Sequence, residues 1–259
     1  MNYKKLIFHW TKPCSKLILP RKDAERHCFI GHLSILLEEG LRYSVPGPDH
    51  HDYIVKDEFD PKWPMICFTE STAGETDWHA ERYGSLGLGF TRKFIFQNHG
   101  RPVAYFDRQT TSPFLKTLLK VLRAARKSGS PDDKHHLDAL CAHFKAYKMP
   151  IVRKAQGYRS AALPSVPRVP EEGDDLHLKF GGPRTNLEDR EWRILQPERI
   201  AEPTQRLKFD AGELALVVLP DHATLSLALK EPKIVEKLHP MGRPAVCLVS
   251  REMLPSIAG

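Results

Sequence analysis

Two stretches near the middle of the chain decide the fold: residues 86–97, LGLGFTRKFIFQ, and residues 101–108, RPVAYFDR. Both contain apolar and aromatic residues of the kind that strands favour, and the tripeptide NHG at 98–100 between them is typical of a turn. Residues 64–71, PMICFTES, form a third run with the length of a buried strand. We therefore expect a sheet at the centre of the protein.

The glycines in GSLGLG, residues 84–89, do not have the G-x-G-x-x-G order of a dinucleotide-binding loop, and we expect no helix directly after them. Glycine inside a strand is more typical of a close backbone approach or a bulge. The sequence therefore predicts tight packing at these positions and no phosphate loop.

The flanking segments supply further strands and helices. Residues 4–11, KKLIFHWT, predict a first strand, and apolar residues at helical spacing predict a helix over 28–41 that ends at Gly40. Residues 231–238 predict a short helix. Four later apolar runs predict strands at 177–180, 191–196, 213–220 and 245–250.

Residues 112–148 change to helical periodicity and predict an antiparallel helical hairpin. Ser130, Pro131 and Asp133 form a capping-box-like start for the second helix. Residues 150–175 are rich in proline, glycine and charge, which predicts a mobile loop. The predicted fold is α+β: one domain over 1–259 with a single mixed or antiparallel sheet, an inserted helical hairpin and this loop.

Length and composition exclude several classes of protein. The 259 residues carry a formal charge of +7 and are 41% hydrophobic, and no apolar run approaches the ~18 residues of a membrane-spanning helix. Five widely spaced cysteines favour neither a disulfide framework nor a zinc ribbon. We therefore expect a cytoplasmic protein without a membrane partner, and the charge admits nucleic acid or an anionic ligand without selecting one.

Six segments, in order along most of the chain, carry a resemblance to one bacterial family. The most characteristic is residues 79–106, in which RYG at 82–84 is followed by GLGF at 87–90 and NHGRPV at 98–103. Together the six resemble the abortive phage resistance family AbiGi, an antitoxin family. The resemblance implies a phage-defence role in an abortive-infection or toxin–antitoxin pair, with a cognate toxin or another protein encoded nearby as partner. The other five segments are 8–11, 34–41, 66–71, 190–194 and 207–220.

A polar pair on the first strand, a following helix and a glutamate on a late strand also resemble the ADP-ribosyltransferase type of fold. This resemblance implies an NAD pocket in which His9 and Thr11 bind the cofactor while Tyr83 and Glu191 are catalytic. A histidine and a hydroxyl can hydrogen-bond the ribose and amide of NAD, and a carboxylate can stabilise the cationic sugar that forms as nicotinamide departs. The alternatives are a core histidine, a packed tyrosine, and ion pairs between Glu191 and its arginine neighbours.

The first helix of the predicted hairpin has a basic face. Its cations recur every three to four residues, opposite a row of leucines, and such a stripe suits an acidic protein partner or a phosphate backbone. A solvated helix face is the alternative, and no helix-turn-helix spacing supports reading of DNA bases. The stripe, called the basic stripe below, consists of Lys116, Lys120, Arg123 and Lys127.

Three functions remain open at this point. The first is an antitoxin-like binding module, the second is an ADP-ribosyltransferase-like toxin that uses NAD to modify a protein or a nucleic acid, and the third is a DNA-binding regulator of its own operon. Cys14, His27, Cys28 and His32 fit no known zinc-finger spacing, so we expect no metal. The residues leave the oligomeric state open.

Overall fold

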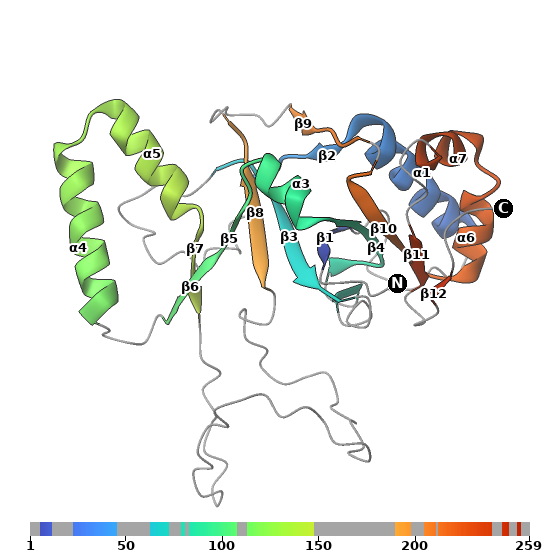
Figure 1. The fold of residues 1–259 in the computed structure, drawn as a ribbon, viewed down its shortest axis with the longest axis horizontal. Helices are drawn as coiled ribbons and strands as arrows, with labels where there is room; N and C mark the ends of the chain where they lie inside the picture. Colours follow the sequence, from blue (N-terminus) through green and yellow to red (C-terminus); the bar gives the residue numbers. More distant parts are fainter. Residues whose placement is uncertain are drawn as a thin grey trace, which may run out of the picture.

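The computed structural model has a mixed α+β fold with a mostly antiparallel sheet, as the sequence predicts (Figure 1). Within the described part of the chain there are six helices. The predicted strand at 177–180 and the predicted mobile loop at 150–175 lie outside the described residues. The structure describes residues 6–11, 23–45, 63–72, 79–80, 83–107, 113–147, 190–197, 205–210, 212–239, 245–248 and 253–254.

Eight strands form the main sheet, in the order β12-β11-β10-β4-β1-β3-β8-β5. All neighbouring pairs in it are antiparallel except β10 and β11, which are parallel. Strands predicted around residues 4–11, 64–71, 191–196, 213–220 and 245–250 are all present. The strands are β1 (Leu6–Thr11), β3 (Met65–Ser71), β4 (Leu86–Phe90), β5 (Arg101–Pro102), β8 (Glu191–Leu195), β10 (Leu214–Leu219), β11 (Ala245–Leu248) and β12 (Met253–Leu254).

Alternation along the strands divides the side chains of this sheet between two faces. Residues directly opposite each other in an antiparallel pair point to the same face. Phe8 is opposite Thr69, and Thr69 is opposite Glu191, so these three side chains share one face. His9 is opposite Leu88 and lies on the other face.

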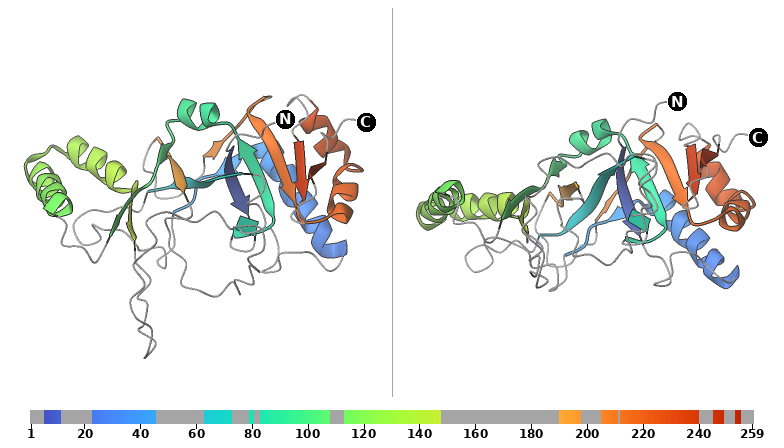
Figure 2. Two further views of the ribbon diagram at one scale, coloured as in Figure 1. Left: turned by 60° about the horizontal axis from the view of Figure 1, so that its bottom comes forward. Right: turned by 90° about the horizontal axis from the view of Figure 1, so that it is seen from below.

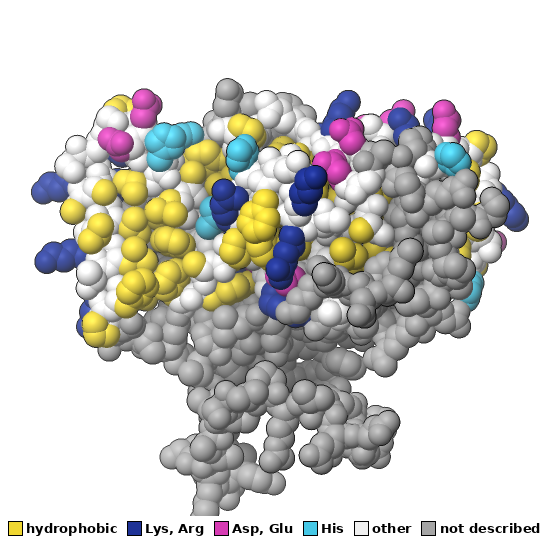
Figure 3. Space-filling view, in the orientation of Figure 1, with side chains coloured by type: hydrophobic (Ala, Val, Ile, Leu, Met, Phe, Trp, Pro, Cys, Tyr) yellow, Lys and Arg dark blue, Asp and Glu magenta, His cyan; other side chains and the backbone are white. Residues whose placement is uncertain are grey.

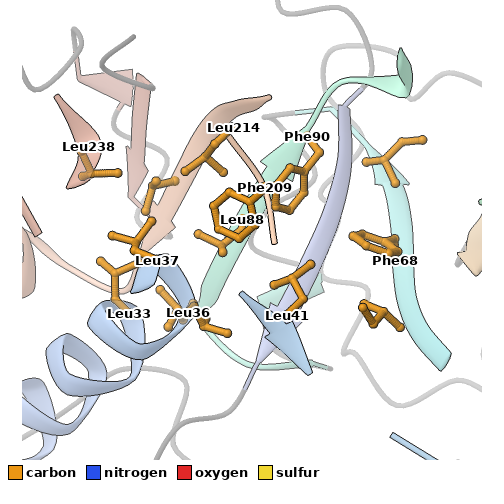
Figure 4. Packing of buried hydrophobic residues seen from close by; sticks show 14 of the residues in the cluster. Leu33, Leu36, Leu37, Leu41, Phe68, Leu88, Phe90, Phe209, Leu214 and Leu238 are labelled. Carbon is orange, nitrogen blue, oxygen red and sulfur yellow. The ribbon is translucent and has the colours of Figure 1, made fainter. Parts of the chain in front are cut away.

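The main core lies on the face that carries Leu88. It joins strand residues such as Phe68, Leu88 and Phe90 to Leu33 and Leu36 of helix α1 (Asp23–Glu39) (Figure 4). Helices α3 (Arg92–Gln97), α6 (His222–Ala228) and α7 (Pro232–Leu238) add side chains to the same cluster. Helix α7 was predicted from the sequence, whereas α6 was not.

A smaller cluster on the opposite face explains the glycines of β4. Phe8 and Trp10 stack with ring centroids 5.3 Å apart. A Cβ at Gly87 would lie 2.8 Å from Trp10 Cζ3, and one at Gly89 would lie 2.8 Å from Phe8 Cε1. The neighbouring strand β10 also changes register between Leu214 and Leu216. The predicted close approach is therefore confirmed.

The prediction of one long strand over residues 86–97 is wrong in its second half. Strand β4 ends at Phe90, and Thr91 caps helix α3 by accepting a hydrogen bond from the backbone N–H of Phe94 at 3.3 Å. Phe94 and Ile95 enter the core from this helix. We also expected no helix after the glycines, and that expectation is wrong because α3 follows them. The order of the glycines still differs from the G-x-G-x-x-G order of a dinucleotide-binding loop.

The predicted helix at 28–41 begins earlier, at Asp23, and ends where predicted. Gly40 adopts φ +91° and its N–H donates to Leu36 O at 3.0 Å. A Cβ there would lie 2.4 Å from Leu207 O, in strand β9 (Arg206–Leu207), which pairs with β2 (Leu41–Arg42). Glycine is therefore required by both conformation and space.

Two helices and a short parallel ribbon lie beyond the β5 end of the sheet (Figures 1 and 2). The helices are α4 (Pro113–Ser128) and α5 (Pro131–Cys141), and we call the pair the α4–α5 hairpin. The capping box predicted at Ser130 is present, with Asp133 as its partner. Strands β6 (Ala104–Asp107) and β7 (Phe144–Tyr147) enter and leave the hairpin and pair in parallel. Helices α6 and α7 lie at the other end of the molecule (Figure 1).

Candidate functional site

His9 and Thr11 face α1. Nδ1 of His9 donates to the carbonyl oxygen of Cys67 at 3.1 Å, and Thr11 Oγ1 hydrogen-bonds His32 Nε2 of α1 at 2.9 Å. Burial lowers the pKa of His9, with a smaller contribution from His32. Burial, followed by the charge of Arg206, also lowers the pKa of His32. The Thr11–His32 hydrogen bond therefore joins β1 to α1, while His9 is hydrogen-bonded to β3.

Tyr83 lies on the other side of the sheet. It packs against the cluster that contains Phe8 and Trp10, and its ring stacks on His79 with centroids 6.2 Å apart. His79 in turn stacks on Trp10 at 5.8 Å. These contacts give Tyr83 a packing role on the face opposite to His9.

Glu191 is buried at the start of β8 and forms two ion pairs. Its Oε2 lies 2.8 Å from Lys145 Nζ of β7, and its Oε1 lies 2.7 Å from Arg193 Nε. Burial alone would raise the pKa of this carboxyl, but the two cations together hold it at about 2. The carboxylate is therefore ionised and its charge is neutralised by its neighbours.

The structure does not bring the four residues of the transferase hypothesis together. His9 and Thr11 lie on one face of the sheet, while Glu191 and the cluster around Tyr83 lie on the other. The sheet separates His9 and Thr11, which the transferase hypothesis assigns to NAD, from the Glu191 carboxylate that would act on the same ribose. The residues therefore do not fit one NAD pocket.

The groups around Glu191 connect the sheet to the α4–α5 hairpin. The backbone N–H of Glu191 donates to the Tyr105 hydroxyl at 3.3 Å, and Glu191 O accepts from the backbone N–H of Val103 at 2.8 Å. Arg193 donates to Ala142 O at the end of α5. Together with the Lys145 ion pair, these contacts attach β6, β7 and α5 to β8.

Two further titratable groups lie close to this network. Desolvation and then the Glu191 carboxylate raise the pKa of the Cys67 thiol to about 12, so this thiol is a poor nucleophile. Burial, followed by Arg193 and Arg101, lowers the pKa of His143 to about 4. Both groups are neutral at pH 7.

The basic stripe lies on the exposed side of α4. All four of its side chains are exposed, whereas Leu115 and Leu122 of the same helix are buried. Figure 3 shows Lys and Arg side chains projecting at the outer edge of the hairpin. The predicted separation of cations from leucines is therefore confirmed, while their role in binding stays a prediction.

The hairpin also has an apolar face that the sequence reasoning missed. Phe114 and Val121 of α4 are 67% and 59% exposed. Hydrophobic side chains gather over α4, α5 and the β6–β7 ribbon on the face shown in Figure 3. Phe114 and Val121 are two helical turns apart, and this spacing was a signal available in the sequence. We define the apolar face as Phe106, Phe114, Leu118, Val121 and Leu137.

Contacts inside the hairpin hold this face in shape. Arg126 of α4 pairs with the buried Asp138 of α5 at 2.5 Å. Phe106 stacks with Phe114 at 6.4 Å and meets Phe144 edge-on at 5.3 Å. The hairpin is therefore held together by an ion pair and by ring contacts, and it keeps partly exposed apolar side chains.

The cysteines and histidines weighed as metal ligands give no such site in the described part of the chain. Among those residues there is no group of three or more His, Cys, Asp or Glu side chains arranged to hold a metal ion. Cys28 is disulfide-bonded, a pairing that the cysteine spacing did not predict. Cys14 lies outside the described residues.

Comparisons with family models, with curated proteins and with solved structures found no match to this chain. Within the described residues, none of the helices combines the length and apolar character needed to cross a membrane.

Proposed function

We propose that this protein is an antitoxin-like binding module of a phage-defence pair and that its α4–α5 hairpin binds the partner protein. The observation that carries the proposal is the exposed apolar face of the hairpin, on the same helix that carries the basic stripe on another side. Buried apolar anchors inside a polar rim are the usual organisation of a protein–protein interface.

Charge favours an acidic partner. The four cations of the basic stripe would repel a second copy of the same helix, whereas carboxylates at the rim of a partner would be attracted. The resemblance to AbiGi favours the product of a neighbouring gene, a cognate toxin, as that partner in the cytoplasm. The occupant that we propose is therefore an acidic protein segment with apolar anchors.

The other two functions have less support. The transferase-like arrangement would need His9 and Glu191 in one pocket, and they lie on opposite faces of the sheet. Operator binding would use the basic stripe, but α4 also exposes Phe114 and Val121, which favour an apolar protein surface over a phosphate backbone.

Co-expression tests the proposal. The product of the adjacent reading frame is expressed alone, with the wild-type chain, and with the Val121→Glu variant, and growth is scored. We expect slow growth with the neighbour alone, rescue by the wild type, and loss of rescue by Val121→Glu. Rescue that is unaffected by Val121→Glu, or a harmless neighbour that does not bind the wild type, would contradict the proposal.

A matched control uses the same substitution at Val235. This valine is 38% exposed on α7, at the opposite end of the molecule from the hairpin. Val235→Glu adds the same charge to an exposed helix, so it should rescue growth as the wild type does. Equal loss of rescue by both variants would indicate a general effect of charge or stability.

A further inference from the structure

A second exposed surface lies on α3 and β5 and is separate from the apolar face. Phe96 is 49% exposed and its ring packs edge-on against Trp192, with centroids 5.5 Å apart. The guanidinium carbon of Arg101 lies over the Phe96 ring, 6.0 Å from its centroid. An exposed aromatic ring and an exposed arginine therefore form a short stack at the surface.

This stack rests on a fixed base. The indole N–H of Trp192 donates to Glu70 Oε2 at 3.2 Å, and Arg92 pairs with Glu70 Oε1 at 2.5 Å. Glu70 is buried, and both of its carboxylate oxygens are thus engaged by donors. The Glu70 carboxylate is therefore neutralised by Arg92. The surface formed by α3 and β5 keeps the positive charges of Lys93 and Arg101.

Cations surround the exposed ring. Arg92 and Lys93 precede Phe96 by one helical turn, so helical spacing places them beside it, and both are exposed. Arg101 adds a third exposed cation from β5. In Figure 3, Lys and Arg side chains flank hydrophobic side chains in the middle of the face, over α3.

We propose that Phe96 and Arg101, with Arg92 and Lys93, form a binding site for single-stranded nucleic acid. An unpaired base can stack on an aromatic ring or on the plane of a guanidinium, while neighbouring cations bind its phosphates. A duplex keeps its base faces inside its own stack and cannot use such a platform. The site lies apart from the α4–α5 hairpin and does not depend on the function proposed for it.

The test is fluorescence anisotropy of the full chain with fluorescein-labelled 12-nucleotide oligo(dT) and oligo(rU), and with a 12-base-pair duplex. At low salt we expect both single strands to bind more tightly than the duplex, and the stronger of the two identifies DNA or RNA. Because Arg92 is already paired with Glu70, Lys93 and Arg101 are the two cations left to contact phosphates, and two contacts predict that affinity falls about sevenfold between 50 and 200 mM salt. Absence of single-strand binding at 50 mM salt, or equal binding of the duplex, would overturn the proposal.

Variants separate stacking from general attraction. Phe96→Ala should weaken single-strand binding by about 5- to 150-fold, whereas Phe96→Trp should retain it. Arg101→Gln is compared with Lys233→Gln, which removes one positive charge from the exposed side of α7, far from α3. Weakening by Arg101→Gln but not by Lys233→Gln supports the site. Equal effects of these two, or an unchanged affinity of Phe96→Ala, would refute it, and a thermal unfolding curve for each variant checks the fold.

Discussion

His9 and Glu191 point to opposite faces of one sheet, although β1 and β8 are each paired to β3. His9 faces α1, where its neighbours are Cys67 O and His32. Glu191 faces the hairpin side, where Lys145 and Arg193 neutralise it. Glu191 therefore links the sheet to the hairpin and does not contact His9.

Replacement of Glu191 by glutamine should therefore reduce stability. The change removes the negative charge that compensates Lys145 and Arg193, and breaking a buried ion pair typically costs about 3–5 kcal/mol. We expect a loss of about 3 kcal/mol in the free energy of unfolding, measured by urea denaturation.

Glu39→Gln is the control for that experiment. Glu39 pairs with Arg206 at 2.7 Å, but both side chains are substantially exposed, so its loss should cost about 1 kcal/mol or less. The structural role of Glu191 would be contradicted by a Glu191→Gln variant that is as stable as the wild type. The contradiction would be complete if the wild type transferred label from NAD to a protein or nucleic acid and this variant did not.

The pH dependence of stability should reflect His143. Its pKa is lowered from 6.5 to about 4 in the folded protein, by burial first and then by Arg193 and Arg101. Between these two values the unfolded chain binds a proton that the folded chain does not, so acidification from pH 6.5 to 4 favours unfolding. Urea midpoints at pH 7 and pH 4.5 should differ more for the wild type than for His143→Gln. The same pH dependence in both proteins would contradict this assignment.

A methyl group at Gly87 should destabilise the sheet. Gly87→Ala places a Cβ 2.8 Å from the buried ring of Trp10, and overpacking of this kind costs about 1–3 kcal/mol. Gly31→Ala adds the same group in the interior of α1, where nothing lies within 4 Å, and should stabilise by about 1 kcal/mol. Thermal unfolding should thus show shifts of opposite sign. A stabilised Gly87→Ala variant would show that the ring is not packed against β4.

Local signals in the sequence predicted much of the fold. Apolar runs located the principal strands, Gly40 marked the end of α1, and Ser130 with Asp133 marked the start of α5. Each of these features depends on residues that are close together in the sequence, so it can be recognised without the fold. Helix α3 was missed because Phe94, Ile95 and Phe96 favour strands, and the Thr91 cap outweighs that preference.

The candidate site was harder to predict because it depends on register. His9, Tyr83 and Glu191 have suitable chemistry, but a strand alternates its side chains between faces, and a shift of one residue reverses the outcome. The pairing of Phe8 with Thr69, and of Thr69 with Glu191, places Glu191 on the same face as Phe8. His9 follows Phe8 along β1 and therefore lies on the other face. The apolar face of the hairpin needed no such information, since Phe114 and Val121 already have the spacing of one helix face.

Isothermal titration calorimetry with the purified product of the adjacent reading frame tests the central claim most directly. We predict that wild type and Val235→Glu bind it with equal affinity, while Val121→Glu binds at least about tenfold more weakly, as expected when a charge replaces an apolar anchor. Equal affinity of Val121→Glu and the wild type, or failure of the wild type to bind, would contradict it.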